Sequence, residues 1–123
     1  MRVLFVFPDF GLVKNRQGHL VLERGGWYAE GVGSLAAVLK QRGHHASLYH
    51  LTGPVGREEF TARLQREAPD LVAFSVRTQV FRPASEYAIW AKQAGYQTIF
   101  GSYHPTVNPE ETSESPGVDM ICI

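Results

Sequence analysis

Short apolar runs alternate with amphipathic segments along the whole chain. The first run covers residues 3–7, and the run over residues 70–76 is the most strand-like of the set. Continuous apolar runs of this kind are typical of parallel strands that are buried on both faces. Further strands are predicted over residues 46–51, 97–100 and 118–123, with 70–76 at the centre of the sheet.

Between these runs, apolar residues recur at helical spacing. The first helix is marked by positions i, i+3, i+4 and i+7, which are Val32, Leu35, Ala36 and Leu39. A second helix over about residues 58–68 is stopped by Pro69, and a third has Pro83 at its first position and ends at Gly95. Asn108 followed by Glu111 indicates the capped start of a short further helix.

Residues 10–30 break this pattern. The passage is polar and rich in glycine, and it is predicted to be a long loop, which in a compact domain is usually functional or mobile. Trp27 and Tyr28, just before the first helix, are interpreted as a lid over a cofactor or as a contact to a further domain.

Strands and helices that alternate with short connections predict an α/β fold. We expect a Rossmann-like, flavodoxin-like domain over residues 1–123, with a five-stranded parallel sheet in the order 2-1-3-4-5 and helices on both faces. Because the chain stops on an apolar strand without a cap, it is expected to be the N-terminal fragment of a longer protein.

Composition narrows the possible partners. The 12 basic and 12 acidic residues cancel, which argues against nucleic acid as the main partner. No apolar run approaches the roughly 20 residues of a membrane span, and no signal-peptide pattern is visible, so a cytoplasmic location is expected. The single Cys122 excludes an internal disulfide and a cysteine-only metal site within the chain, and it is expected to be a small hydrophobic residue in a buried strand.

In this fold, ligands bind at the carboxyl ends of the strands. Small residues after the fourth strand, Gly101 and Ser102, let a bulky ligand approach the backbone. The predicted cofactor-binding set at this edge is Pro8, Asp9, Phe10, Gly11, Ser75, Val76, Arg77, Thr78, Gln79, Gly101, Ser102, Tyr103, His104, Pro105 and Thr106.

Several chemistries fit this edge poorly. A phosphoacceptor site needs clustered acids, and only Asp9 follows the first strand. The glycine spacing of a dinucleotide site and the phosphate loop of a flavin site are also absent from that position. No Ser-His-Asp or paired-carboxylate arrangement stands out, so no catalytic residue is predicted, and His104 is expected to be a positioning contact rather than a metal ligand.

The chain resembles the N-terminal cobalamin-binding domain of B12-dependent radical S-adenosylmethionine (SAM) enzymes. The most specific stretch is residues 101–111, which read G-x-x-H-P-T-x-x-P-E-E, and the other similar stretches are residues 2–8, 31–44, 69–76 and 118–123. The resemblance implies that this chain binds cobalamin and is not itself the catalytic part. It also implies a downstream barrel domain with S-adenosylmethionine and an iron–sulfur cluster, and methyl transfer as the reaction.

One departure concerns the cobalt ligand. Cobalamin mutases and proteins like methionine synthase carry Asp-x-His-x-x-Gly after the first strand, whereas Asp9 is followed here by Phe10 and Gly11, and the next histidine is His19. We therefore expect cobalamin with its own base displaced and no histidine on cobalt, its lower face meeting residues 77–79. The alternatives are a flavodoxin-like regulatory or interaction domain without cofactor, and a nucleotide- or flavin-binding domain.

Overall fold

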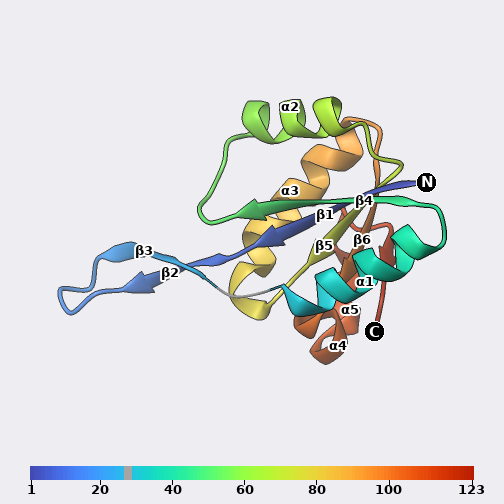
Figure 1. The fold of residues 1–123 in the computed structure, drawn as a ribbon. Helices are drawn as coiled ribbons and strands as arrows, with labels where there is room; N and C mark the ends of the chain where they lie inside the picture. Colours follow the sequence, from blue (N-terminus) through green and yellow to red (C-terminus); the bar gives the residue numbers. More distant parts are fainter. Residues whose placement is uncertain (27–28) are drawn as a thin grey trace.

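The computed structural model describes residues 1–26 and 29–123, so the roles suggested for Trp27 and Tyr28 lie outside the described residues. Its main element is a parallel sheet in the order β4-β1-β5-β6-β7 (Figure 1). The strands are β4 (His45–Leu51), β1 (Arg2–Pro8), β5 (Leu71–Ser75), β6 (Gln97–Gly101) and β7 (Met120–Ile121). Counted along this sheet the order is 2-1-3-4-5, which confirms the predicted fold.

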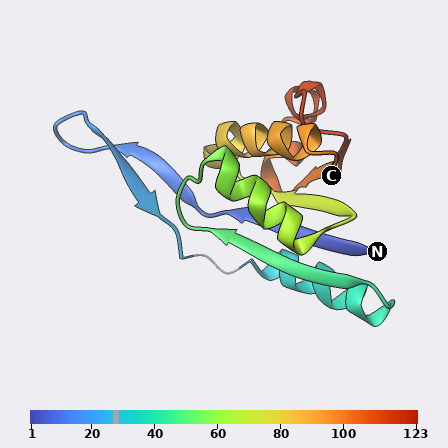
Figure 2. The same cartoon turned by 90° about the horizontal axis from the view of Figure 1, so that it is seen from above.

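Helices cover the two faces unequally (Figure 2). One face carries α1 (Glu30–Gln41), and the other carries α2 (Arg57–Glu67) and α3 (Phe81–Gln93). Three short elements follow strands on the ligand side, namely η1 (Thr78–Val80), α4 (Tyr103–Val107) and α5 (Pro109–Glu114). None of the helices in the described part of the chain is long and apolar enough to cross a membrane.

The hydrophobic core is correspondingly one-sided. The larger cluster lies between the sheet and α2 and α3, and it includes the fully buried Leu4, Phe60 and Phe100. A smaller cluster of Val3, Phe5 and Val32 lies under α1. Because α1 covers the β4 side of its face, the part of that face over β6 and β7 carries no helix among the described residues.

The prediction of a loop over residues 10–30 is wrong for most of that passage. Residues 10–24 form an antiparallel hairpin of β2 (Phe10–Lys14) and β3 (Leu20–Arg24). Its turn is closed by Asn15, whose side-chain oxygen accepts hydrogen bonds from the backbone of Gln17 and His19. The leucines and valines of the two strands, rather than the glycines around them, decide the local structure.

Three smaller predictions also need correction. Helix α3 begins at Phe81, so Pro83 is its third residue, which is tolerated because first-turn N–H groups have no partner within the helix. The last strand is only Met120–Ile121, since it pairs only with Ile99 and Phe100 of β6. Cys122 follows this strand and is exposed, rather than buried within a strand.

Asp119 anchors the chain segment directly before β7. Its carboxylate lies 2.9 Å from Lys92 Nζ and accepts a hydrogen bond from the Thr98 backbone N–H at 3.0 Å. The hydrogen bond from Lys92, followed by that from Thr98, lowers the pKa of Asp119 below its ordinary value of 3.8. A group with a depressed folded-state pKa stabilises the fold above its unfolded pKa, and this contribution is lost as the pH falls through the folded pKa.

We therefore expect Asp119→Asn to lower the free energy of unfolding by about 1 kcal/mol at neutral pH. The difference from the parent chain should shrink as the pH falls below 3.8. Denaturant unfolding at several pH values measures both quantities. A difference that stays constant down to strongly acidic pH would show that the charge of Asp119 contributes nothing.

Candidate functional site

The structure brings together the loops that follow β5 and β6. Ser75 lies in register with Gly101, and the Val76 backbone N–H donates to Gly101 O at 3.0 Å. The His104 backbone N–H then donates to Val76 O at 3.0 Å. These bonds extend the pairing past the ends of both strands, so the two predicted ligand loops form one continuous ledge.

Asp9 is the centre of a polar cluster at the end of β1. Its side chain is fully buried, with one carboxylate oxygen 2.8 Å from His50 Nε2 and the other accepting from Arg77 Nη2 at 3.1 Å. The rings of His50 and Phe7 lie 5.2 Å apart, and the Arg77 guanidinium lies 5.8 Å from the Phe7 ring. A buried carboxylate needs such partners, because an uncompensated buried charge is strongly destabilising.

Gly25 closes this cluster from the hairpin side. Its backbone N–H donates to Asp9 O at 2.8 Å. A Cβ at position 25 would lie 2.5 Å from the same backbone oxygen and would overlap the Asp9 carboxylate. The hairpin therefore returns to the body at a point where only glycine fits, and its base is fixed to the ends of β1, β4 and β5.

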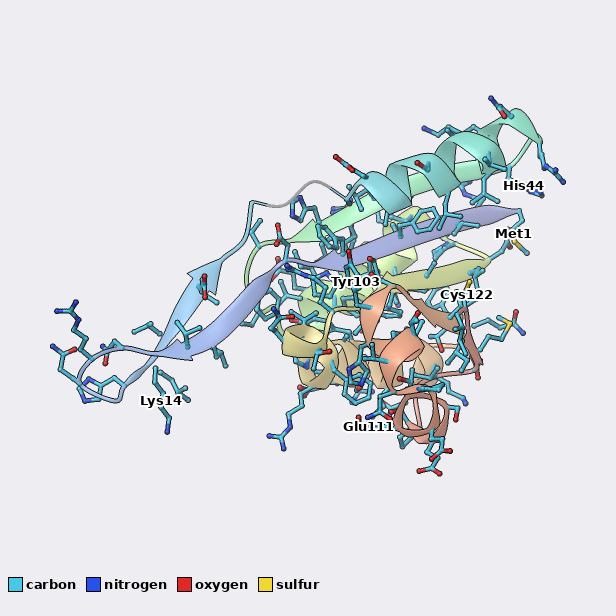
Figure 3. All side chains as sticks on the ribbon, turned by 90° about the horizontal axis from the view of Figure 1, so that it is seen from below. Met1, Lys14, His44, Tyr103, Glu111 and Cys122 are labelled. Carbon is cyan, nitrogen blue, oxygen red and sulfur yellow. The ribbon has the colours of Figure 1, made fainter. Side chains whose placement is uncertain are left out.

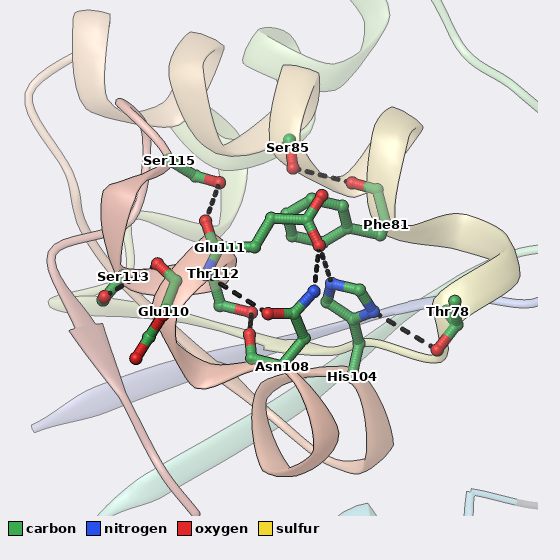
Figure 4. Close-up of polar contacts among 10 residues, drawn as sticks. All are labelled: Thr78, Phe81, Ser85, His104, Asn108, Glu110, Glu111, Thr112, Ser113 and Ser115. Carbon is green, nitrogen blue, oxygen red and sulfur yellow. Dashed lines mark hydrogen bonds and ion pairs between the residues drawn. The ribbon is translucent and has the colours of Figure 1, made fainter.

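The side chain of His104 is buried and lies between Thr78, Phe81 and Glu111 (Figure 4). Its ring stacks on Phe81 with centroids 4.0 Å apart, and its Nδ1 lies 3.2 Å from Thr78 Oγ1. Its Nε2 lies 3.3 Å from Glu111 Oε2, which is an ion-pair distance without hydrogen-bond geometry. The ring thus links α4 to η1, α3 and α5 as a positioning contact.

The remaining predicted residues divide by exposure. Pro8, Phe10, Val76 and Pro105 are buried and serve as support, whereas Thr78, Gln79, Tyr103 and Thr106 are exposed. Gly11, Ser75, Arg77 and Gly101 are intermediate. Of the predicted set, the exposed and intermediate residues on η1, α4 and the strand ends are those that a ligand at this edge can reach.

Small side chains lie at the ligand end of the open half of the sheet face, beyond Ile99 and Met120. Ala73 and Ser75 of β5 alternate onto this face, and Gly101 lies beside them in β6. A Cβ at Gly101 would lie 3.8 Å from Cys122 Cβ, which is ordinary contact, so the space above the glycine is open. Among the described residues, the fold thus leaves an uncovered strip of sheet face beside α1 that reaches the ligand edge at Ser75 and Gly101, and we call this strip the slot.

Ser102 adopts a backbone conformation that L-residues rarely adopt. Its φ of 82° and ψ of −150° fall in a region populated almost only by glycine. The strain is held by the backbone bonds of the ledge and by Thr106 Oγ1, which donates to Ser102 O at 2.9 Å.

Replacing Ser102 by glycine is expected to raise the free energy of unfolding by about 1 kcal/mol, because relief of strain exceeds the extra freedom of the unfolded chain. Thermal or denaturant unfolding measures this gain, and Ser102→Ala, which keeps the strain, should not produce it. Equal stability of the glycine and alanine variants would contradict the strained backbone.

A second hollow, of about 610 Å³, lies between α3 and α5. Its lining includes three carboxylates, those of Glu110, Glu111 and Glu114, against one basic residue, Arg82. It is an open depression that includes Phe81 and Glu111, two contacts of His104, and its charge disfavours a phosphate-bearing ligand. The ledge and the slot are therefore the better candidate site.

Sequence reasoning missed His50, Glu111 and the close-approach role of Gly25. His50 reaches Asp9 because it lies in register with Phe7 on the same sheet face, two residues before Asp9. The predicted strand order places β4 beside β1, but the register between the two strands is given only by the structure. The pair Gly25-Gly26 was a visible signal for a close backbone approach.

Comparisons with known proteins agree with this geometry. A family model described as the B12 binding domain matches residues 24–123. A solved structure described as a novel cobalamin-binding protein from Desulfitobacterium hafniense superposes with a TM-score of 0.67 at 15% identity, which shows a shared fold. The match covers 98% of this chain and 52% of that one, so the chain spans about half of that protein's length. No curated protein matches the sequence. Because the B12 binding domain model covers most of the sequence, the chain belongs to the B12-binding domain family.

Proposed function

We propose that this chain holds cobalamin at the carboxyl edge of its sheet, as the cofactor module of a B12-dependent radical SAM enzyme that transfers a methyl group. The observation that carries the proposal is the slot of small side chains beside Gly101, in a chain of the B12-binding family. Cobalamin supplies a cobalt–carbon bond as a source of one-carbon or radical chemistry when it is bound.

The residues present fit the size and chemistry of this cofactor. Its nucleotide tail needs a narrow passage with few side chains, which Ala73, Ser75 and Gly101 provide. Its broad, largely apolar ring needs a ledge, and the exposed residues of η1 and α4 lie at that level. Pockets that are mostly apolar with a few polar groups are typical of such ligands.

We further propose that cobalt receives no histidine from this chain. His104 is buried with its two nitrogens beside Thr78 and Glu111, and His19 lies in the turn of the hairpin. His50 is bound to Asp9 through Nε2. Thr78 and Gln79, in the loop after β5, are exposed at this edge and would meet the lower side of the ring instead.

Electron paramagnetic resonance of the reduced, cob(II)alamin-loaded chain tests this ligation. We expect a spectrum without splitting from an axial nitrogen, in the parent chain and in His50→Ala alike. Nitrogen splitting in the parent chain that disappears in His50→Ala would identify His50 as the ligand and contradict the proposal.

The radical SAM context rests on the sequence resemblance over residues 101–111. It predicts that, in the complete protein, Ile123 is followed by a Gly-Glu-Gly-Glu segment and then by a three-cysteine motif. Sequencing the complete gene tests this directly. A different continuation would leave cobalamin binding in place and remove the assignment to radical SAM enzymes.

A further inference from the structure

The β2–β3 hairpin leaves the ligand edge directly after Asp9 and projects beyond the body of the domain (Figure 3, where Lys14 marks β2). It is apolar on both faces and exposed: Leu12, Leu20 and Leu22 share one face, and Val13 and Val21 share the other. A two-stranded hairpin is marginally stable by itself in water, and exposed apolar surface of this kind marks a contact.

The two faces have different surroundings. Phe10, which alternates onto the leucine face, packs in the core cluster on the side of α2 and α3. On the same face, Leu22 lies 3.5 Å from the position that a Cβ of Gly53 would take. The valine face lies on the opposite side, which by alternation is the side of Asp9. Asp9 shares a face with Phe5 and therefore with α1 and the slot.

The base of the hairpin is held in position. Gly25 bonds to the Asp9 backbone, while Arg77 and His50 hold the Asp9 side chain. Strand β2 also lies beside η1, the short helix that follows β5. The base of the valine face therefore lies at a fixed place beside η1, and the face extends outward from the ledge.

We propose that the Val13–Val21 face is a wall of the cobalamin site and packs against apolar groups of the corrin ring. This inference rests on the proposed function. Val13 and Val21 are direct cross-strand partners, exposed by 40% and 39%, and together they present a flat, branched apolar surface. A five-residue strand spans about 17 Å, long enough to lie along one side of a macrocycle. Glu23, beside Gly11 on the same face, offers a carboxylate to the amide groups of the rim.

Other apolar groups at the same edge support a ligand as the occupant. Tyr103 and Val107 of α4 are each 71% exposed, although they lie next to the buried His104 and Pro105. A cofactor on the ledge would cover apolar groups of both α4 and the valine face. By alternation the slot lies on the same side of the sheet as Asp9 and the valine face, whereas the leucine face lies on the opposite side.

The two faces supply a matched test in the intact chain. The double variant Val13→Thr and Val21→Thr keeps side-chain shape and strand propensity but places hydroxyl groups on the wall. We expect it to weaken hydroxocobalamin binding at least tenfold, or about 1.4 kcal/mol, in a visible-absorbance titration. The control, Leu12→Thr with Leu20→Thr, should bind within about twofold of the parent chain.

Amide hydrogen exchange gives a second reading on the unaltered chain. Hydroxocobalamin should slow exchange in the hairpin, at residues 11–13 and 20–22, as well as at the ledge. Three results would each contradict the proposed wall without contradicting cobalamin binding. They are normal binding by the valine variant, equal weakening of binding in both variants, and unchanged amide exchange in the hairpin. Failure of the parent chain to bind would instead refute the proposed function and the wall together. Weaker hydroxocobalamin binding by the leucine variant alone would also contradict the proposed wall and would indicate a contact on the leucine face.

Discussion

Replacing Gly117 by alanine is expected to destabilise the domain by about 3 kcal/mol or more. A Cβ at this position would lie 2.4 Å from Ile89 N and 2.6 Å from Ala88 C, which are backbone atoms of α3. No side chain can move aside to relieve this overlap, so α3 or the segment before β7 has to shift. Thr98 Oγ1 donates to Gly117 O, and the shift would break this buried bond.

Denaturant unfolding of the Gly117→Ala chain measures the loss. The matched control is Gly33→Ala in α1, where nothing in the described residues beyond the helix's own backbone and the chain neighbours lies within 4 Å of the new Cβ. Alanine is the better helix former, so the control should gain about 0.5–1 kcal/mol. Equal and small effects at the two positions would contradict the close packing of α3 on the last connection.

Replacing Gly101 by phenylalanine is expected to weaken cobalamin binding about a hundredfold or more, a loss of roughly 2.7 kcal/mol. Position 101 is half-buried beside Ser75 and opens onto the part of the sheet face that no described helix covers. A large side chain can therefore enter the slot without a clash in the free protein. It would occupy the volume that the nucleotide tail needs, so binding should fall while the free energy of unfolding stays close to that of the parent chain.

Two control variants separate this blocking from other effects. Gly101→Ala adds a Cβ that makes ordinary contact with Cys122, and it should cost much less binding than phenylalanine. Gly33→Phe adds the same large side chain to an exposed position of α1 and should leave binding unchanged. Unchanged binding by Gly101→Phe would show that the tail does not lie in this slot.

The arrangement of strands and helices could be predicted because burial imposes it. The runs around residues 3–7 and 70–76 are apolar at successive positions. This pattern is typical of strands that are covered on both faces, because side chains on both faces must then be apolar. With helices between them, right-handed crossovers leave few possible orders for a five-stranded sheet.

The hairpin was not predicted because its pattern serves no internal core. Leu12 and Val13, like Leu20 and Val21, place apolar residues on both faces, so neither alternation nor a fully buried run is visible. Without a strand pattern, the glycines on either side of these residues favoured the prediction of a loop. Beyond Phe10, which packs in the core cluster, the apolar residues of the hairpin are exposed, so the pattern of the hairpin is not explained by the core.

The candidate site was predicted in location but not in its contacts. Residues at strand ends could be named because the fold fixes which ends meet at one edge. The Asp9 cluster could not be predicted. His50 and Arg77 lie 41 and 68 residues from Asp9 in the sequence, and they meet it only through the register of the sheet. His104 was found by its motif, but its direction depends on the stacking surface of Phe81 and on Thr78.

The central claim is that this chain binds cobalamin at the carboxyl edge of its sheet. The most direct measurement is to incubate the purified chain with hydroxocobalamin, remove free cofactor by desalting, and record the visible spectrum together with circular dichroism. We predict a coloured, folded protein that retains close to equimolar cobalamin, and the Gly101→Phe chain should lose this colour. A folded but colourless parent chain after desalting would contradict the account.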